Sequence, residues 1–212
     1  MLAKLKSRAV VIGLVCLAVG GARAEPTDNW VQEYVVQFLG PEGSPGGAGV
    51  YLGKGLVITA AHVVGPQSRT VGIDGVSLAA RLIKGGGDPD LSLLSMDERT
   101  LPTSLLERRM PLCQEQPPVG APVILGAVRG ITRTSIASPM LIPPEMRTKF
   151  STLISEAETN GKSGSGVFDA EKKCLLGILS AKIRNNIENK DIASYFVPAS
   201  AIQSFVPPGT RW

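Results

Sequence analysis

The segment Leu56-Val57-Ile58-Thr59-Ala60-Ala61-His62-Val63-Val64 organises the interpretation of the whole chain. An apolar run with strand character ends in small residues and delivers His62, the only histidine among 212 residues. An imidazole with small neighbours that leave room for a substrate suits a general base. A lone histidine is more often structural or simply exposed, so this segment indicates catalysis only if it has partners elsewhere.

A second segment offers an acid for that imidazole. Asp88-Pro89-Asp90 comes directly before the apolar run Leu91–Leu94, so the Asp90 carboxylate is expected where a strand begins to be buried. Such a carboxylate accepts a hydrogen bond from imidazole and fixes its tautomer. Asp88 is the rival acid, although Pro89 separates it from the strand. The alternative is an ordinary aspartate in a turn.

The third segment, Asn160–Phe168, has the sequence NGKSGSGVF. Its closely spaced glycines allow a tight backbone turn around one serine. Such a turn can direct the N–H groups of Gly161 and Ser163 to one point, which makes an oxyanion hole. Ser165 is the rival nucleophile, and a flexible Gly/Ser loop is the alternative. The apolar end of the segment indicates that the loop is anchored to a buried strand.

The pattern around these segments is all-β. Short runs of Val, Ile and Leu are separated by Gly and Pro. The chain has 24 Gly and 16 Pro, which argues against long helices. We expect a first strand at Val31–Leu39, a turn-rich loop at Pro41–Gly47 and a polar connector at Leu101–Pro111. One short helix is expected, at Ala199–Phe205.

About a dozen strands in two halves, joined near the connector, fit two small antiparallel barrels with a cleft between them. Open sandwiches would give the same list of strands, so periodicity alone does not select a barrel. No short-period repeat or low-complexity tract interrupts the pattern.

Together the three segments resemble the chymotrypsin-like (trypsin-like) serine proteases. Thr59–His62 matches that family's Thr-Ala-Ala-His motif, Asp90–Leu94 its Asp-apolar-small-Leu-Leu motif, and Gly161–Gly164 its Gly-x-Ser-Gly core. The order His, Asp, Ser is that of chymotrypsin and differs from the order in subtilisins and α/β-hydrolases. The resemblance runs from about Val31 to Phe205, and details of the serine loop resemble a bacterial branch that includes HtrA-type and glutamyl-endopeptidase-type proteases.

The resemblance implies two six-stranded antiparallel β-barrels with the active site between them. It places the base and the acid in an N-terminal barrel, residues 25–108, and the nucleophile in a C-terminal barrel, residues 109–212. His62, Asp90 and Ser163 would be the catalytic triad, with the Gly161 and Ser163 N–H groups as the oxyanion hole. No cofactor is implied.

Substrate preference is less clear. Digestive relatives carry Asp before the serine, where this chain has Lys162, so activation by a freshly cut N-terminus is not expected. By the resemblance, Ala157 lies at the floor of the primary pocket, and Ser180, Ala181 and Lys182 form its wall, where extended substrate pairs as a β-strand. Trypsin has Asp at the floor, so a preference for Arg or Lys is not supported. Lys182 either attracts an acidic side chain or is a solvated strand lysine.

Residues 1–24 have the pattern of a signal peptide. A basic start, an apolar stretch from Ala9 to Gly21 and the small residues of Ala22–Ala24 predict cleavage before Glu25 and export to the periplasm or the exterior. The alternative is an uncleaved anchor. Loss of this leader removes four basic residues and cancels the formal net charge of +4. A surface for nucleic acid or a stable membrane association is therefore not indicated.

Two cysteines remain after cleavage, Cys113 and Cys174. In an oxidising compartment we expect them to form a disulfide, with two buried thiols as the alternative. One histidine and two cysteines do not make a zinc site, so no metal is expected.

The sequence thus predicts an exported serine endopeptidase acting on proteins or peptides through an acyl-enzyme. The first alternative is a catalytically latent or inactive trypsin-like fold that serves as a protein-binding module, because Lys162 beside Ser163 and a misformed oxyanion loop would leave the site idle. The second is an esterase with the same triad. Oligomeric state is not indicated.

Overall fold

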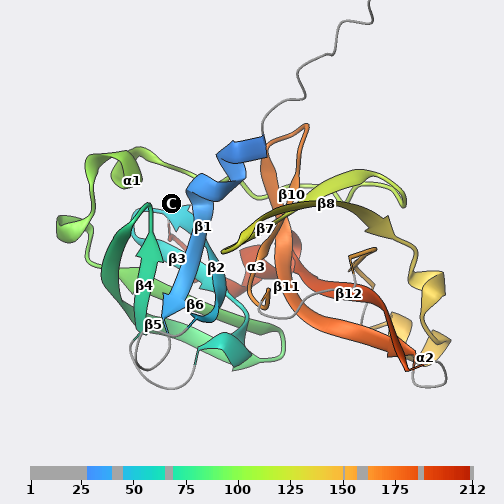
Figure 1. Cartoon of the computed structure of the whole chain (residues 1–212). Coiled ribbons are helices and arrows are strands. Elements are labelled where there is room, and N and C mark those ends of the chain that lie inside the picture. The colour runs from blue at the N-terminus through green and yellow to red at the C-terminus, as the bar shows by residue number, and fades with distance from the viewer. Residues whose placement is uncertain are drawn as a thin grey trace, which may run out of the picture.

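The computed structural model describes residues 28–39, 45–64, 69–149, 151–156, 162–185 and 189–210. Strands dominate this part of the chain (Figure 1). They are β1 (Val35–Leu39), β2 (Pro45–Gly53), β3 (Leu56–Thr59), β4 (Arg69–Ile73), β5 (Val76–Gly87), β6 (Asp90–Met96), β7 (Pro122–Ala127), β8 (Gly130–Ala137), β9 (Leu153–Ile154), β10 (Gly166–Asp169), β11 (Cys174–Asn185) and β12 (Lys190–Pro198). The helices are short: η1 (Asp28–Tyr34), η3 (Ala61–Val63), η4 (Glu98–Thr100), α1 (Thr103–Glu107), η5 (Pro139–Leu141), α2 (Pro144–Arg147) and α3 (Ala199–Phe205).

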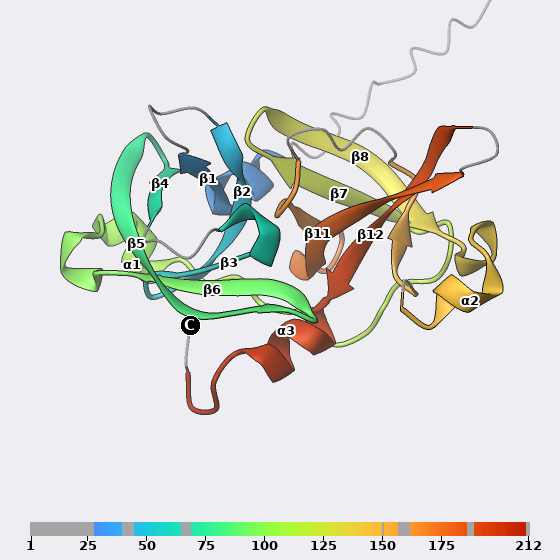
Figure 2. The same cartoon turned by 90° about the horizontal axis from the view of Figure 1, so that it is seen from below.

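The strands form two closed antiparallel barrels of six strands each. The first has the order β1-β2-β3-β6-β5-β4 and the second β10-β11-β12-β9-β8-β7. The two lie side by side, joined by the segment that contains α1 (Figures 1 and 2). The predicted fold class is therefore confirmed, and barrels rather than open sandwiches are formed.

Local sequence explains the tight hairpins of the first barrel. Lys54-Gly55 and Asp74-Gly75 both have positive φ at their two residues, as a two-residue turn of the primed type requires. In the same barrel, β3 is buried along its whole length, and its partner β6 is buried along most of its length. Their run of Val, Ile and Leu side chains therefore fills both the barrel interior and the boundary between the barrels.

One apolar cluster joins the two barrels. It combines side chains of the first barrel, such as Val50 and Leu93, with side chains of the second, such as Phe168 and Ile178. Residues of η1 and α3 belong to the same cluster. In Figure 2, α3 lies beneath the boundary next to β6, so the last helix of the chain also covers the first barrel.

Three expectations for local structure were wrong at their edges. The first strand begins at Val35, because Asp28–Tyr34 forms the 3-10 helix η1 and packs on the second barrel, with the Trp30 ring edge-on to Phe168 at 5.7 Å. Strand β2 begins at Pro45, inside the expected loop. The connector contains the short helix α1 at Thr103–Glu107, which buries Leu105. Tertiary packing decides each of these boundaries, and local propensity does not.

Within the described residues, no helix has the length and apolar character needed to cross a membrane. The predicted signal peptide, residues 1–24, lies outside the described residues.

Candidate active site

His62 lies on η3, immediately after β3, and Asp90 is the first residue of β6, the strand that pairs with β3. The Asp90 carboxylate forms two hydrogen bonds with His62. Its Oδ1 accepts the His62 backbone N–H at 3.1 Å, and its Oδ2 lies 2.8 Å from Nδ1 of the ring. An ionised carboxylate only accepts hydrogen bonds, so Nδ1 carries the proton and Nε2 of the neutral ring is left as an acceptor. This is the tautomer that a general base needs.

Ser180, on β11 of the second barrel, donates a 2.6 Å hydrogen bond to the same Oδ2 of Asp90. The register of β11 against β12 shifts between Leu179 and Ala181, and this irregularity at Ser180 directs its side chain away from the regular pleat. Burial by itself raises the pKa of Asp90. The hydrogen bonds from Ser180 and His62 together outweigh that effect and hold the pKa below its ordinary value.

Ser163 lies in a tight turn just before β10. Its neighbour Gly164 has φ +81° and is fully enclosed: a Cβ there would lie 2.0 Å from the Ala48 carbonyl oxygen and 2.2 Å from Thr59 Oγ1. Only glycine fits such a position. The turn is further held by hydrogen bonds from Gly164 N to Leu179 O and from Ser165 N to Lys162 O, both 2.9 Å.

The turn is also fastened to the first barrel, close to His62. Ala48 of β2 donates its N–H to the Ser163 carbonyl at 2.9 Å. A Cβ on Gly47 would lie 2.6 Å from Val63 Cγ1 and 3.3 Å from the Ser163 carbonyl oxygen, so the neighbour of His62 and the backbone of Ser163 flank the same glycine. Among the described residues, no hydrogen bond joins Ser163 Oγ to the His62 ring. In unliganded sites that bond is often long or absent and tightens when substrate binds.

The two rival residues lie in less suitable places. Ser165 is completely buried, and its hydroxyl has no hydrogen-bond partner in the described part of the molecule. Asp88 is exposed in the turn before β6. Gly161 and Ala157, the expected oxyanion donor and pocket floor, lie outside the described residues.

The expected pocket wall follows Ser180 along β11. Lys182 is half-buried and forms an ion pair with Asp191 of β12 at 3.1 Å, and Arg184 contacts the same carboxylate at 2.9 Å. The hydrogen bonds from Arg184 and then Lys182 hold the pKa of Asp191 below its ordinary value. The Lys182 ammonium is thus paired with a carboxylate of the protein itself. The Ser180 hydroxyl donates to Asp90, a contact that the sequence does not signal because the two residues are 90 positions apart. The expected contact of Ser180 with substrate stays a prediction.

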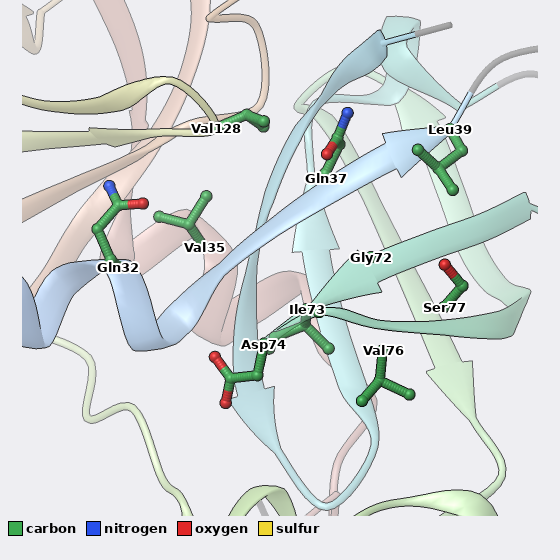
Figure 3. A pocket seen from close by; sticks show the side chains of 11 residues that line it. Gln32, Val35, Gln37, Leu39, Gly72, Ile73, Asp74, Val76, Ser77 and Val128 are labelled. Atoms are coloured by element: carbon green, nitrogen blue, oxygen red, sulfur yellow. The ribbon is translucent and has the colours of Figure 1, made fainter. Parts of the chain in front are cut away.

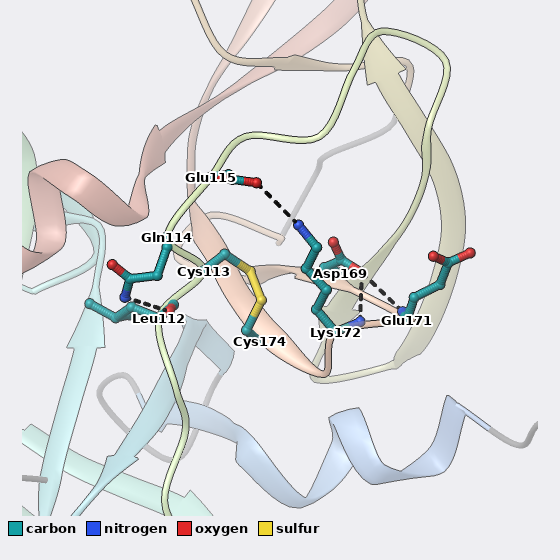
Figure 4. Close-up of a disulfide and its surroundings, with 8 residues drawn as sticks. All are labelled: Leu112, Cys113, Gln114, Glu115, Asp169, Glu171, Lys172 and Cys174. Atoms are coloured by element: carbon teal, nitrogen blue, oxygen red, sulfur yellow. Dashed lines mark hydrogen bonds and ion pairs between the residues drawn. A yellow bond between two sulfur atoms is a disulfide. The ribbon is translucent and has the colours of Figure 1, made fainter.

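The expected disulfide is present, with a Cα–Cα distance of 5.1 Å between Cys113 and Cys174. It fastens the segment between the barrels to the start of β11 (Figure 4). Beside it, Cys113 N donates to Leu175 O at 3.0 Å and Leu175 N donates to Pro111 O at 2.8 Å. The strand that carries Ser180 is therefore anchored at its first residue.

A hollow of about 380 Å³ lies on the first barrel and contains none of the three candidate catalytic residues. Figure 3 shows that side chains of β1 and of the β4–β5 hairpin surround it, with Val128 approaching from the β7–β8 turn. Asp74 in its wall is paired with Arg108 at 2.9 Å. Across the described ranges, no group of three or more His, Cys, Asp or Glu side chains is arranged to hold a metal ion.

Comparison with known proteins agrees with this geometry. Residues 47–178, more than half of the chain, match the family model of the trypsin-like peptidase domain. No curated protein matches significantly.

Solved structures with the same fold include three bacterial ones. The inactive form of the Rv3671c protease of M. tuberculosis has a TM-score of 0.62 and 19% identity, and the match covers 83% of this chain and 88% of that one. The serine endoprotease from Yersinia pestis has a TM-score of 0.62 and 19% identity, covering 84% and 65% of the two chains. The MamO protease domain from Magnetospirillum magneticum has a TM-score of 0.60 and 19% identity, covering 84% and 97%. At such identities these likenesses show the fold alone.

Proposed function

The chain belongs to the trypsin-like peptidase family, and we propose that it is an exported serine endopeptidase that works through His62, Asp90 and Ser163. The observation that carries this proposal is the double hold of Asp90 on His62, with Nδ1 and the backbone N–H both bonded to one carboxylate. A histidine that served only as a surface residue would not need its tautomer and its backbone held by the same acid.

In the proposed reaction, Ser163 Oγ attacks the carbonyl carbon of a peptide bond while His62 Nε2 takes the hydroxyl proton. The developing oxyanion is held by the N–H groups of Gly161 and Ser163. In support, the Ser163 N–H makes no hydrogen bond within the described residues and is free to donate. His62 then gives the proton to the leaving amine. In the second half of the reaction, water attacks the acyl carbon while His62 takes a proton from the water, and His62 returns that proton to Ser163 Oγ as the acyl bond breaks. Asp90 stays ionised throughout, which its lowered pKa favours.

Protein or peptide substrates follow from the family. Export is part of the proposal and is supported by the disulfide, because such bonds persist in oxidising compartments. Two further assignments stay proposals. One is a boundary between the barrels near residue 108, and the other is contact with substrate by Ala157, Ser180, Ala181 and Lys182.

Labelling of the purified protein with a serine-directed fluorophosphonate tests the proposal. We expect labelling of the wild type and its loss in both Ser163→Ala and His62→Ala, with a decrease of at least about 10³-fold because the two residues act as one unit. Folded wild type that stays unlabelled would contradict the proposal. That result would favour a latent or inactive trypsin-like fold that serves as a protein-binding module.

A further inference from the structure

We propose that Lys162 and Glu156 are positioning residues whose ion pair holds the turn that carries Ser163. The inference rests on the proposed function of Ser163, but part of its test does not depend on activity. It concerns the lysine that directly precedes the candidate nucleophile, at the place where the sequence suggested an idle site.

The Lys162 ammonium contacts two side chains of the second barrel. Its Nζ lies 3.5 Å from Glu156 Oε1 and 3.4 Å from Thr132 Oγ1. The side chains of Lys162 and Glu156 are only 24% and 17% exposed. Pairing at this depth is screened less by solvent and salt than a surface pair is.

Glu156 is itself firmly placed. It lies just after β9, separated from it by Ser155, and its carbonyl accepts a 2.5 Å hydrogen bond from the hydroxyl of Ser194, a fully buried residue of β12. Thr132 belongs to β8, which pairs with β9. The two partners of the ammonium therefore lie on β8 and just after β9, and β12 holds the backbone of Glu156 in place. Together they give the turn a fixed support.

The other end of Lys162 is coupled to Ser163 through the backbone. The Lys162 carbonyl accepts the Ser165 N–H at 2.9 Å, which closes the turn around Ser163 and Gly164. Leu179 N donates to Ser165 O at 2.8 Å, so the turn is also bonded to β11. A shift of Lys162 would therefore move the Ser163 N–H and hydroxyl together.

The two charges of this ion pair, on Lys162 and Glu156, both belong to side chains, and neither is a chain terminus. The Ser163 turn would thus be held without a newly cut N-terminus, and the site would be ready once the barrel has folded. Loss of Lys162 removes a positive charge from beside the half-buried Glu156 carboxylate, which is more harmful than replacement of both members of the pair.

The experiment compares four full-length mature proteins: wild type, Lys162→Met, Lys162→Arg and Lys172→Met. Lys172 is the matched control, because it also pairs with a glutamate, Glu115, at 3.7 Å, but lies beside the disulfide (Figure 4). Two quantities are measured: the second-order rate of fluorophosphonate labelling, and amide hydrogen exchange of the peptide that contains residues 162–166. Thermal unfolding confirms that each variant is folded.

We expect Lys162→Met to label about tenfold more slowly or worse and to exchange at least about tenfold faster in the turn, since removal of one member of a half-buried ion pair shifts such equilibria by that order. Lys162→Arg should restore most of the rate, and Lys172→Met should equal wild type in both measurements. Equal labelling and equal exchange in Lys162→Met and wild type would overturn the inference while leaving the proposed function intact. If the wild type does not label, the proposed function fails, and unchanged exchange alone would then overturn the role of the ion pair.

Discussion

At the scale of single residues, the Asp90 carboxylate is the most heavily used group of the candidate site. It accepts hydrogen bonds from the backbone and ring of His62 and from Ser180 of the other barrel. Because these bonds favour the ionised form, the pKa of Asp90 is lowered despite burial. A lowered pKa stabilises the folded state above the ordinary carboxyl pKa, and that contribution is lost as pH falls through the lowered value.

The first prediction concerns Ser180→Ala. At pH 7 we expect the free energy of unfolding to fall by about 1 kcal/mol, the value for a hydrogen bond to a charged group discounted for partial exposure. The loss should shrink as pH falls through the lowered pKa of Asp90, because protonation of its carboxylate removes the benefit in both proteins. Urea unfolding at several pH values measures it. Ser204→Ala, which alters an exposed helix hydroxyl, is the control and should show no such trend. A loss that grows at acid pH would contradict the assignment.

The second prediction concerns Gly164, whose enclosed, left-handed backbone shapes the Ser163 turn. Gly164→Ala should lower the free energy of unfolding by more than about 2 kcal/mol, because the new methyl group meets backbone on top of the strained φ. Labelling of Ser163 should be lost. Gly75→Ala is the matched control: φ is +75° there, but nothing lies within 4 Å of the added Cβ. It should lose only about 1 kcal/mol and label normally. Similar losses in both variants would show that the enclosure is unimportant.

At the scale of elements, β11 is the strand on which the candidate site depends most. It begins at Cys174, accepts the Gly164 N–H through Leu179 and carries Ser180 to Asp90. The disulfide to Cys113 fixes its first residue against the segment that leaves the first barrel. The anchored end of the strand, Cys174, and Ser180 in its middle are thus only six residues apart.

The third prediction follows from this bond, which closes a loop of 61 residues in sequence. The double variant Cys113→Ser/Cys174→Ser should lose about 2–4 kcal/mol of unfolding free energy, because the unfolded chain regains the entropy that the cross-link removes. Guanidinium unfolding measures the loss. Wild type treated with a reductant should match the double variant, and reductant should leave the variant unchanged. A double variant as stable as oxidised wild type would contradict the prediction.

At the scale of the whole molecule, the barrels share one apolar cluster, and each end of the described chain crosses to the other barrel. Segment η1 precedes the first barrel but packs on the second, where Asp28, only 7% exposed, pairs with Arg133 at 2.7 Å. Helix α3 follows the second barrel, yet Lys84 of β5 donates to the Phe205 carbonyl at 2.9 Å. These crossings resist separation of the barrels and so keep Ser180 against Asp90.

The fourth prediction is that both barrels unfold in one transition and that Trp30→Ala lowers their common stability. Trp30 contacts both Tyr34 and Phe168 but is only partly buried, so we expect a loss of about 2 kcal/mol, less than for a full core tryptophan. Far- and near-ultraviolet circular dichroism should give coincident curves. Val119→Ala, at an exposed site, should change stability by less than about 0.5 kcal/mol. Two separated transitions would show that the barrels are independent.

Much of this molecule is determined by short stretches of sequence. The strand runs, the Lys54-Gly55 and Asp74-Gly75 turns and the order of the motifs around His62, Asp90 and Ser163 are local patterns, and local patterns specify strands and hairpins directly. The strand runs predicted about a dozen strands in two halves, and the resemblance of the three motifs to the chymotrypsin-like proteases implied two six-stranded barrels. The cysteine pair was predictable for another reason, since only two cysteines remain once the leader is set aside.

Only the tertiary structure decided how distant residues meet. Ser180 reaches Asp90 across 90 positions, and Lys162 lies beside Glu156, just after β9, and Thr132 of β8. Segment η1 packs on the far barrel, so the expected first strand starts later, at Val35. Periodicity shows which face of a strand is buried but not which side chain lies opposite. That choice depends on barrel closure, on register shifts such as the one at Ser180 and on the packing of the two barrels against each other.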